Sequence, residues 1–213
     1  MALNQTQVGA QNNSDGATIA QRAGKQGDAI VSELHGRYFE QNYRGNVYGI
    51  SVAAAAAITA YTGGAAGTPM IAVYNPVTSG KNLSLISANY ANVVAASAAG
   101  TATFGLYYGK TAVVTATANA TPYNQASLLQ AGSVMSGFTN TALTAGSAAT
   151  SVMPLGSYYW ATAAGATLVT QVSPAELAGQ IVIPPGGFVA LGGSAALTSA
   201  TWIGALIWEE VPV

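Results

Sequence analysis

Hydrophobic positions along most of this chain fall in short runs that are typical of β-strands. From Val47 onward, Thr, Val, Ile and Tyr recur over a few residues at a time, and clusters of Gly, Pro, Asn and Ser separate the runs. The alanine run Ala53–Ala57 has a high helix propensity, but its short length and its Val, Ile and Thr neighbours favour a strand. The pattern predicts strands at Val47–Ala54, Ala56–Tyr61, Met70–Tyr74, Leu83–Tyr90, Thr103–Tyr108, Ala112–Ala118, Thr167–Val172, Gln180–Ile183, Gly187–Leu191 and Thr201–Glu210.

Turn residues mark the ends of several of these runs. In Pro184-Pro185-Gly186-Gly187, proline and glycine stand at the two central positions of a type II turn. The stretch Thr121–Gly165 is longer and less regular, so we expect an elaborated end of the fold there, with a short helix near Gln125–Ala131. About eight to ten short strands with such turns predict an all-β, jelly-roll-like antiparallel β-sandwich.

The last predicted strand is apolar on both faces. Trp202, Gly204, Leu206 and Trp208 share one face, while Ile203, Ala205 and Ile207 share the other. One face of an antiparallel sandwich packs on the core, so the second face needs a partner, most simply another copy of the chain. We therefore expect an oligomer interface built from Trp202, Ile203, Leu206, Ile207 and Trp208.

Residues 1–46 differ in composition from residues 47–213, which we expect to form the β-sandwich domain. Met1–Gly27 is rich in Gln, Asn, Gly and Ala and predicts an extended N-terminal arm. The start lacks the basic and apolar regions of a signal peptide, which predicts a cytoplasmic origin. Arginines alternate with acids and aromatic residues further on, as in a docking segment. The predicted docking residues are Arg22, Lys25, Arg37, Tyr38, Phe39, Tyr43 and Arg44.

Charge is scarce and unevenly distributed. Charged residues make up 6% of the 213 residues, against about a quarter in ordinary soluble domains. The net charge of −1 offers no basic surface for nucleic acid, and no apolar run is long enough to span a membrane. We expect the weakly charged body to be covered by other copies or to lie on a particle surface. After Gly45 the charged residues are Lys81, Lys110, Glu176, Glu209 and Glu210.

The residues disfavour most enzyme chemistry. The chain has no cysteine and one histidine, His35, whose neighbours Glu33 and Glu40 more often form ordinary ion pairs than a metal site. Glu209 and Glu210 are adjacent on a strand, so they point to opposite faces and cannot act as paired carboxylates. We therefore expect no enzyme, metal or cofactor. Some aromatic residues could stack on a glycan, although such residues are more often core or interface anchors. These candidates are Tyr107, Tyr108, Tyr158, Tyr159 and Trp160.

Several segments resemble small virion proteins of tailed bacteriophages. The resemblance implies a jelly-roll sandwich, often trimeric, on the outside of the phage head, without catalytic residues. It implies a decoration protein that binds the major capsid protein, made in the host cytoplasm; the alternative is a fibre or receptor-binding protein that recognises a host glycan through residues 121–165. The segments are GKQGDAIVSELHGRYFEQNYRGNV at Gly24–Val47 (with ELHGRYFEQNYRGNVY at Glu33–Tyr48), AVYNPVTSGKNLSL at Ala72–Leu85, IVIPPGGFVAL at Ile181–Leu191 and IWEEVPV at Ile207–Val213.

Overall fold

The computed structural model describes residues 36–94, 100–111, 114, 117–160 and 172–213. The chain divides into two units, Met1–Glu40 and Gln41–Val213. The composition of the sequence had placed the boundary between arm and body after residue 46. In chain order the elements are α1 (Phe39–Tyr43), β1 (Val47–Ile58), β2 (Ala66–Gly67), β3 (Ile71–Tyr74), β4 (Lys81–Val94), β5 (Gly100–Lys110), β6 (Tyr123–Asn124), β7 (Ser136–Thr139), β8 (Leu143–Thr144), β9 (Ser151–Trp160), β10 (Val172–Ile183), β11 (Gly187–Gly193) and β12 (Leu197–Pro212).

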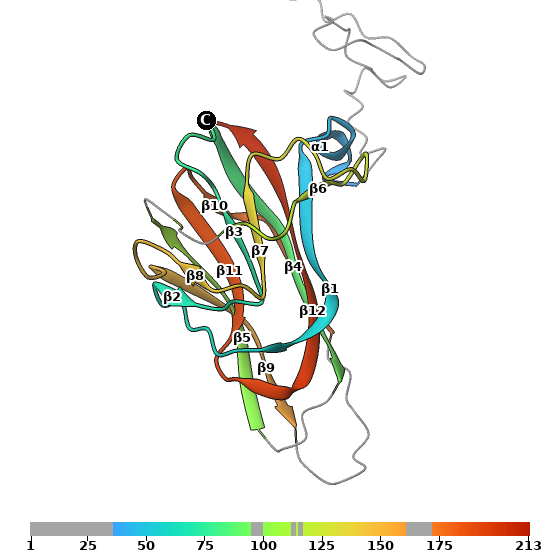
Figure 1. The fold of residues 1–213 in the computed structure, drawn as a ribbon. Coiled ribbons are helices and arrows are strands. Elements are labelled where there is room, and N and C mark those ends of the chain that lie inside the picture. Colours follow the sequence, from blue (N-terminus) through green and yellow to red (C-terminus); the bar gives the residue numbers. More distant parts are fainter. Residues whose placement is uncertain (1–35, 95–99, 112–113, 115–116, 161–171) are drawn as a thin grey trace, which may run out of the picture. The chain divides into compact units, whose positions relative to one another are not determined.

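The strands form an antiparallel β-sandwich, which confirms the predicted fold class (Figure 1). The first sheet has the order β10-β4-β12-β1-β6, and the second has the order β7-β3-β11-β5-β9. The chain crosses between the sheets from β3 to β4 to β5, and again from β9 through β10 and β11 to β12. Alternation of the chain between two packed sheets is also a feature of jelly rolls. The last two strands, β11 and β12, lie inside their sheets rather than at the edges.

Most predicted strands are present, and the alanine run is part of one of them. The first two predicted strands form the single strand β1, with an irregularity in its pairing with β12 between Val52 and Ala56. The prediction of Ala112–Ala118 is wrong where the structure describes it, because Val114 there makes only an isolated bridge to Ala145. The predicted strand Thr167–Val172 lies outside the described residues, apart from Val172 at the start of β10.

The middle of the chain is more regular than its sequence suggests. Four strands, β6 to β9, fall within it, and β9 pairs along almost the whole of β5. The sequence pattern did not predict β9 because this strand contains Pro154, and proline cannot donate a backbone hydrogen bond to a neighbouring strand. At a sheet edge one side of a strand needs no partner, and β9 is such an edge strand. The ladder is irregular opposite Pro154, between Phe104 and Gly105.

The predicted type II turn joins β10 to β11. Gly186 has φ of 79°, in the left-handed region that suits glycine, and the amide of Gly187 donates to the carbonyl of Pro184 at 2.9 Å. The backbone of Asn75, just after β3, bonds to Gly186 and Gly187, so the two buried glycines are fixed against the second sheet, whereas Pro184 is exposed. The prediction of a type II turn is confirmed.

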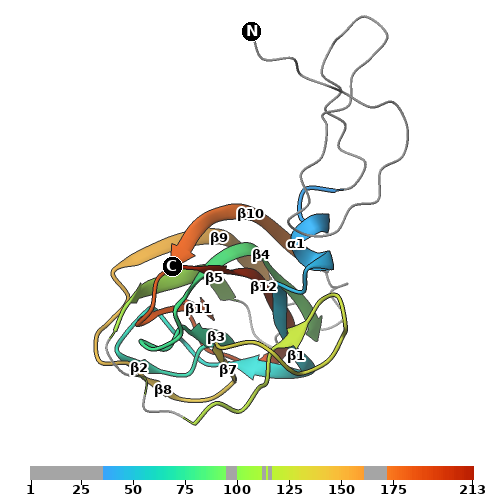
Figure 2. The same ribbon diagram turned by 90° about the horizontal axis from the view of Figure 1, so that it is seen from above.

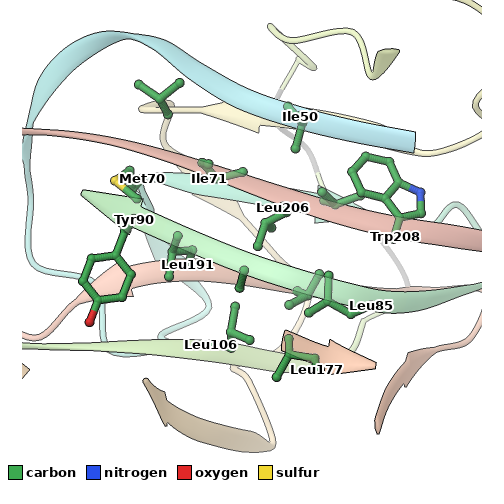
Figure 3. Packing of buried hydrophobic residues seen from close by; sticks show 14 of the residues in the cluster. Ile50, Met70, Ile71, Leu85, Tyr90, Leu106, Leu177, Leu191, Leu206 and Trp208 are labelled. Carbon is green, nitrogen blue, oxygen red and sulfur yellow. The ribbon is translucent and has the colours of Figure 1, made fainter. Parts of the chain in front are cut away.

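The main core lies between the two sheets (Figure 3). It contains large side chains from both, such as Trp208 and Leu206 of β12 and Leu106 of β5. Gly204 lets the sheets approach closely, because a Cβ atom there would lie 2.5 Å from the Cε of Met70.

A second core covers the other side of the second sheet. All of β11 is buried, and its residues Phe188 and Ala190 contribute to this second core, as does Phe138 of β7. The short pair β2–β8 lies on this side of the sandwich (Figure 2). The middle of the chain is therefore largely part of the packed body, rather than an appended end.

Candidate functional site

The strand β12 separates its two apolar faces as the sequence predicts. Trp202, Leu206 and Trp208 are fully buried in the core of this same chain, so they are not available to a second copy, and their assignment to an oligomer interface is corrected. Ile203 is 38% exposed and Ile207 is partly buried on the opposite side. Only these two of the five predicted interface residues face outward.

The outward side of the first sheet is almost free of charge. It is formed where β4, β12 and β1 lie side by side, and we call it the outer face. Burial raises the pKa of the Glu209 carboxyl, one acid on this side of β12. Pairing between strands aligns Ser51 with Ala205 and Ala205 with Asn89. The outer face includes Ser51, Asn89, Ala91, Ile203, Ala205 and Ile207.

Small side chains leave a hollow in the middle of the outer face. The hollow has a volume of about 250 Å³ and is open to solvent. Ile203 projects at its side, because its paired neighbour on β4 is only Ala91. An uncharged depression with an exposed isoleucine is suited to an apolar contact with another molecule. The lining residues are Ser51, Val52, Asn89, Tyr90, Ala91, Ile203, Gly204 and Ala205.

The predicted docking residues fall in different parts of the chain. Arg22 and Lys25 lie outside the described residues, and Arg37, Tyr38 and Phe39 belong to the first unit. Tyr43, which is 77% exposed, and Arg44 belong to the second unit. The amide of Gly45 bonds to the carbonyl of Asn42 at the end of α1, and Gly45 has positive φ. A capsid contact of these residues stays a prediction.

The predicted helix at Gln125–Ala131 is wrong, and a tight loop stands in its place. The carboxamide oxygen of Asn124 accepts hydrogen bonds from the amides of Ala126 (3.0 Å) and Ser127 (3.1 Å), which starts a single helical turn. The turn ends at Leu128, whose φ of 59° does not allow a helix to continue. We call residues 125–131 the leucine loop, because Leu128 is 73% exposed and Leu129 is 64% exposed. Sequence reasoning missed this surface; its signal was a Leu-Leu pair among polar residues.

Hydrogen bonds hold the leucine loop in place. The amide of Asn124 donates to the carbonyl of Leu129 (2.9 Å), and the amide of Leu128 donates to the carbonyl of Asn124 (2.8 Å). The amide of Gln125 bonds to the carbonyl of Val47, and the Nδ2 of Asn124 bonds to the carbonyl of Gly45. The loop is therefore fixed to the start of β1.

A buried acid ties one end of the sandwich together. The Glu210 side chain is fully buried; one carboxylate oxygen lies 3.0 Å from the Nζ of Lys81, and the other accepts from the hydroxyl of Ser133 at 2.6 Å. The amide of Val134 also donates to this carboxylate. Glu209 is only partly buried. The two neighbouring acids therefore differ in burial, as expected for residues on opposite faces of a strand. Glu210 connects β12 to Lys81 of β4 and to the segment at Ser133 and Val134.

Tyr61 and Tyr107 pack edge to face in the second core, with ring centroids 5.5 Å apart. Burial, and secondarily the charge on Tyr107, raise the pKa of Tyr61 to about 12. Tyr107 and Tyr108 pack in or against the two cores, so they are poor candidates for stacking on a glycan. The side chains of Tyr158, Tyr159 and Trp160 lie outside the described part of the chain.

We expect the stability of the protein to fall as the pH rises above about 10. An unfolded tyrosine ionises near pH 10, whereas Tyr61 in the folded chain keeps its proton until about pH 12. Between these values the unfolded state binds fewer protons, so the free energy of unfolding decreases with pH. Urea unfolding from pH 8 to 11.5 should show a shallower decrease for Tyr61→Phe than for the wild type. Tyr43→Phe, at an exposed position, should keep the wild-type slope; an unchanged slope in Tyr61→Phe would contradict the assignment.

No group of three or more potential metal ligands occurs among the described residues, and His35 lies outside them. Within the same part of the chain, no helix is long and apolar enough to cross a membrane. Comparison of the chain with protein-family models, curated proteins and solved structures finds no match.

Proposed function

We propose that this chain is a structural protein of a bacteriophage virion, which decorates the capsid by binding the major capsid protein as a homo-oligomer, a trimer. The observation that carries the proposal is the nearly uncharged outer face, where Ile203 is exposed in the middle of a sheet. An isolated soluble domain normally covers such a surface with charged side chains. The resemblance of Glu33–Tyr48 to virion proteins supports the same assignment.

The proposed mechanism is mechanical rather than catalytic. Each bound copy covers apolar and aromatic surface along the seams between capsid subunits, and it binds the assembled shell in preference to free subunits. Binding to one state stabilises that state by mass action. Exposed Tyr43 and Arg44 are residue types that commonly anchor protein interfaces. In this proposal the protein lies on the outer surface of the particle.

Deletion of Met1–Gly27 should abolish binding to the capsid, because the proposal assigns docking to this arm and the segment after it. The measurement is co-sedimentation of the purified protein with particles that lack it. An arm replaced by a Gly/Ser segment of equal length should also fail, which separates sequence from length. Val152→Asp, at an exposed position on β9, should bind normally. Full binding of the deletion variant to the particles would contradict the assignment of capsid docking to the arm.

A second candidate function is recognition of a host glycan by a fibre protein. One observation favours it: a hollow of about 280 Å³ between residues 118–122 and 130–137 is lined by uncharged hydrogen-bonding side chains, including Thr121, Gln130 and Ser136. Such groups suit the hydroxyls of a sugar. Binding to a glycan array that is lost in Gln130→Ala, together with unchanged binding of the arm deletion to particles, would favour this function over decoration.

A further inference from the structure

The leucine loop is an apolar projection that the folded chain holds in a strained backbone conformation. Leu128 has φ of 59°, a left-handed conformation that costs about 1–2 kcal/mol for a residue with a side chain. Glycine would avoid this cost, and with 73% of its surface exposed, Leu128 gains little from packing within the chain. Hydrogen bonds among residues 124–129 hold this conformation, and residues held in strained backbone conformations are concentrated at functional surfaces.

The hollow is the matching depression, and it belongs to the same sheet. The leucine loop follows β6 at one edge of the first sheet, whereas the hollow lies over β1, β12 and β4 in its interior. Leu128 and Leu129 are exposed and the hollow is open, so the loop does not fill the hollow of its own copy. One surface is convex, the other is concave, and no charged residue belongs to either.

We propose that the leucine loop of one copy inserts Leu128 and Leu129 into the hollow of the next copy. This inference rests on the homo-oligomer of the proposed function and assigns its contact. Because the contact joins two different surfaces, it is heterologous, and a heterologous contact that closes forms a ring such as a trimer. Gln125, Ser127 and Gln130 surround the leucines in the sequence, and Ser51 and Asn89 line the hollow. Leucines in the centre with polar groups around them match the usual anatomy of an interface.

The lack of charge on both surfaces favours another copy of the chain as the occupant of the hollow. The projection and the depression are both uncharged, so stacking copies around a ring brings no like charges together. A membrane anchor would instead combine apolar residues with a basic face, and the leucine loop contains no Lys or Arg.

Two complementary variants test this contact. Leu128→Asp/Leu129→Asp disables the projection, and Ala205→Arg fills the hollow. Light scattering at about 50 μM should show an oligomer for the wild type and a monomer for each variant. An equimolar mixture of the two variants should form a one-to-one heterodimer, because each contributes one intact surface. Misfolded variants could not recover in this way. Matched exposed positions outside the contact, Val77→Asp and Val152→Arg, should leave the oligomer intact.

Cross-linking gives an independent readout, because the chain has no cysteine. Mixed Leu128→Cys and Ala205→Cys proteins should form an intermolecular disulfide under mild oxidation, whereas Leu128→Cys mixed with Val152→Cys should not. A monomeric wild type, variants that keep the wild-type oligomer, or a mixture that stays monomeric would each overturn the proposed contact. Co-sedimentation with capsids is measured separately, so loss of this contact with retained capsid binding leaves the decoration function standing. Vesicle binding that requires Leu128 and Leu129 would overturn the proposal in favour of a membrane contact.

Discussion

Replacing Trp202 by alanine should lower the free energy of unfolding by about 3–5 kcal/mol, the usual loss for a buried aromatic side chain. Trp202 is fully buried, and its ring centroid lies 4.5 Å from that of Phe104 and 6.1 Å from that of Tyr90. Phe104 belongs to the second sheet, while Tyr90 and Trp202 belong to the first. The substitution therefore opens a cavity between the sheets.

The measurement for Trp202→Ala is urea unfolding followed by circular dichroism, because the substitution changes the fluorescence signal. Val182→Ala removes side-chain carbon from a residue that is 53% exposed on β10. It should change the free energy of unfolding by no more than about 0.5 kcal/mol. A loss below about 1 kcal/mol for Trp202→Ala would contradict its place in the core.

Lys81→Met should lower the free energy of unfolding by about 3 kcal/mol. The substitution leaves the buried carboxylate of Glu210 without its cation, and breaking a buried ion pair in this way costs about 3–5 kcal/mol. We expect the lower end of this range because the Lys81 side chain is 30% exposed. The remaining hydrogen bonds from Ser133 and Val134 do not neutralise the charge.

The double variant Lys81→Met/Glu210→Gln should recover most of the stability lost in Lys81→Met. A glutamine keeps an oxygen that can accept from Ser133, and it carries no charge to bury. Replacement of both members of a buried pair by neutral residues is often close to neutral. Urea unfolding of Lys81→Met, Glu210→Gln and the double variant gives the double-mutant cycle. A double variant as unstable as Lys81→Met alone would show that the charge of Glu210 is not what destabilises it.

Alternation and turn chemistry were enough to predict the fold class. The runs around Leu83–Tyr90 and Thr201–Glu210 lie in strands, and the turn at Pro184–Gly187 has the predicted type. The strand β9 was not predictable from propensity, because Pro154 is acceptable only at an edge, and edges are defined by pairing between distant segments. The helix expected at Gln125–Ala131 ends after one turn, because Leu128 adopts a left-handed backbone conformation there.

Only part of the candidate surfaces could be predicted from the sequence. Alternation along β12 correctly separated Trp202 from Ile203, but it could not tell which face the core would cover. The hollow depends on the pairing of small residues across three strands, such as Ser51 beside Ala205 and Ala91 beside Ile203, and the register that aligns them is a property of the fold. The exposure of Leu128 follows from a backbone conformation that propensities do not predict.

The positions of β11 and β12 impose an order on biosynthesis. Each inserts between two strands that precede it in the chain, β3 and β5 for β11, and β1 and β4 for β12. Neither sheet can be completed on the ribosome until these segments emerge, and such non-local pairing folds slowly. Because β12 also supplies Ile203 and Ala205 to the hollow, a nascent or truncated chain has no receiving surface for a neighbouring copy. In the proposed oligomer, only finished molecules would therefore be able to join, and unfinished ones would be protected from premature association.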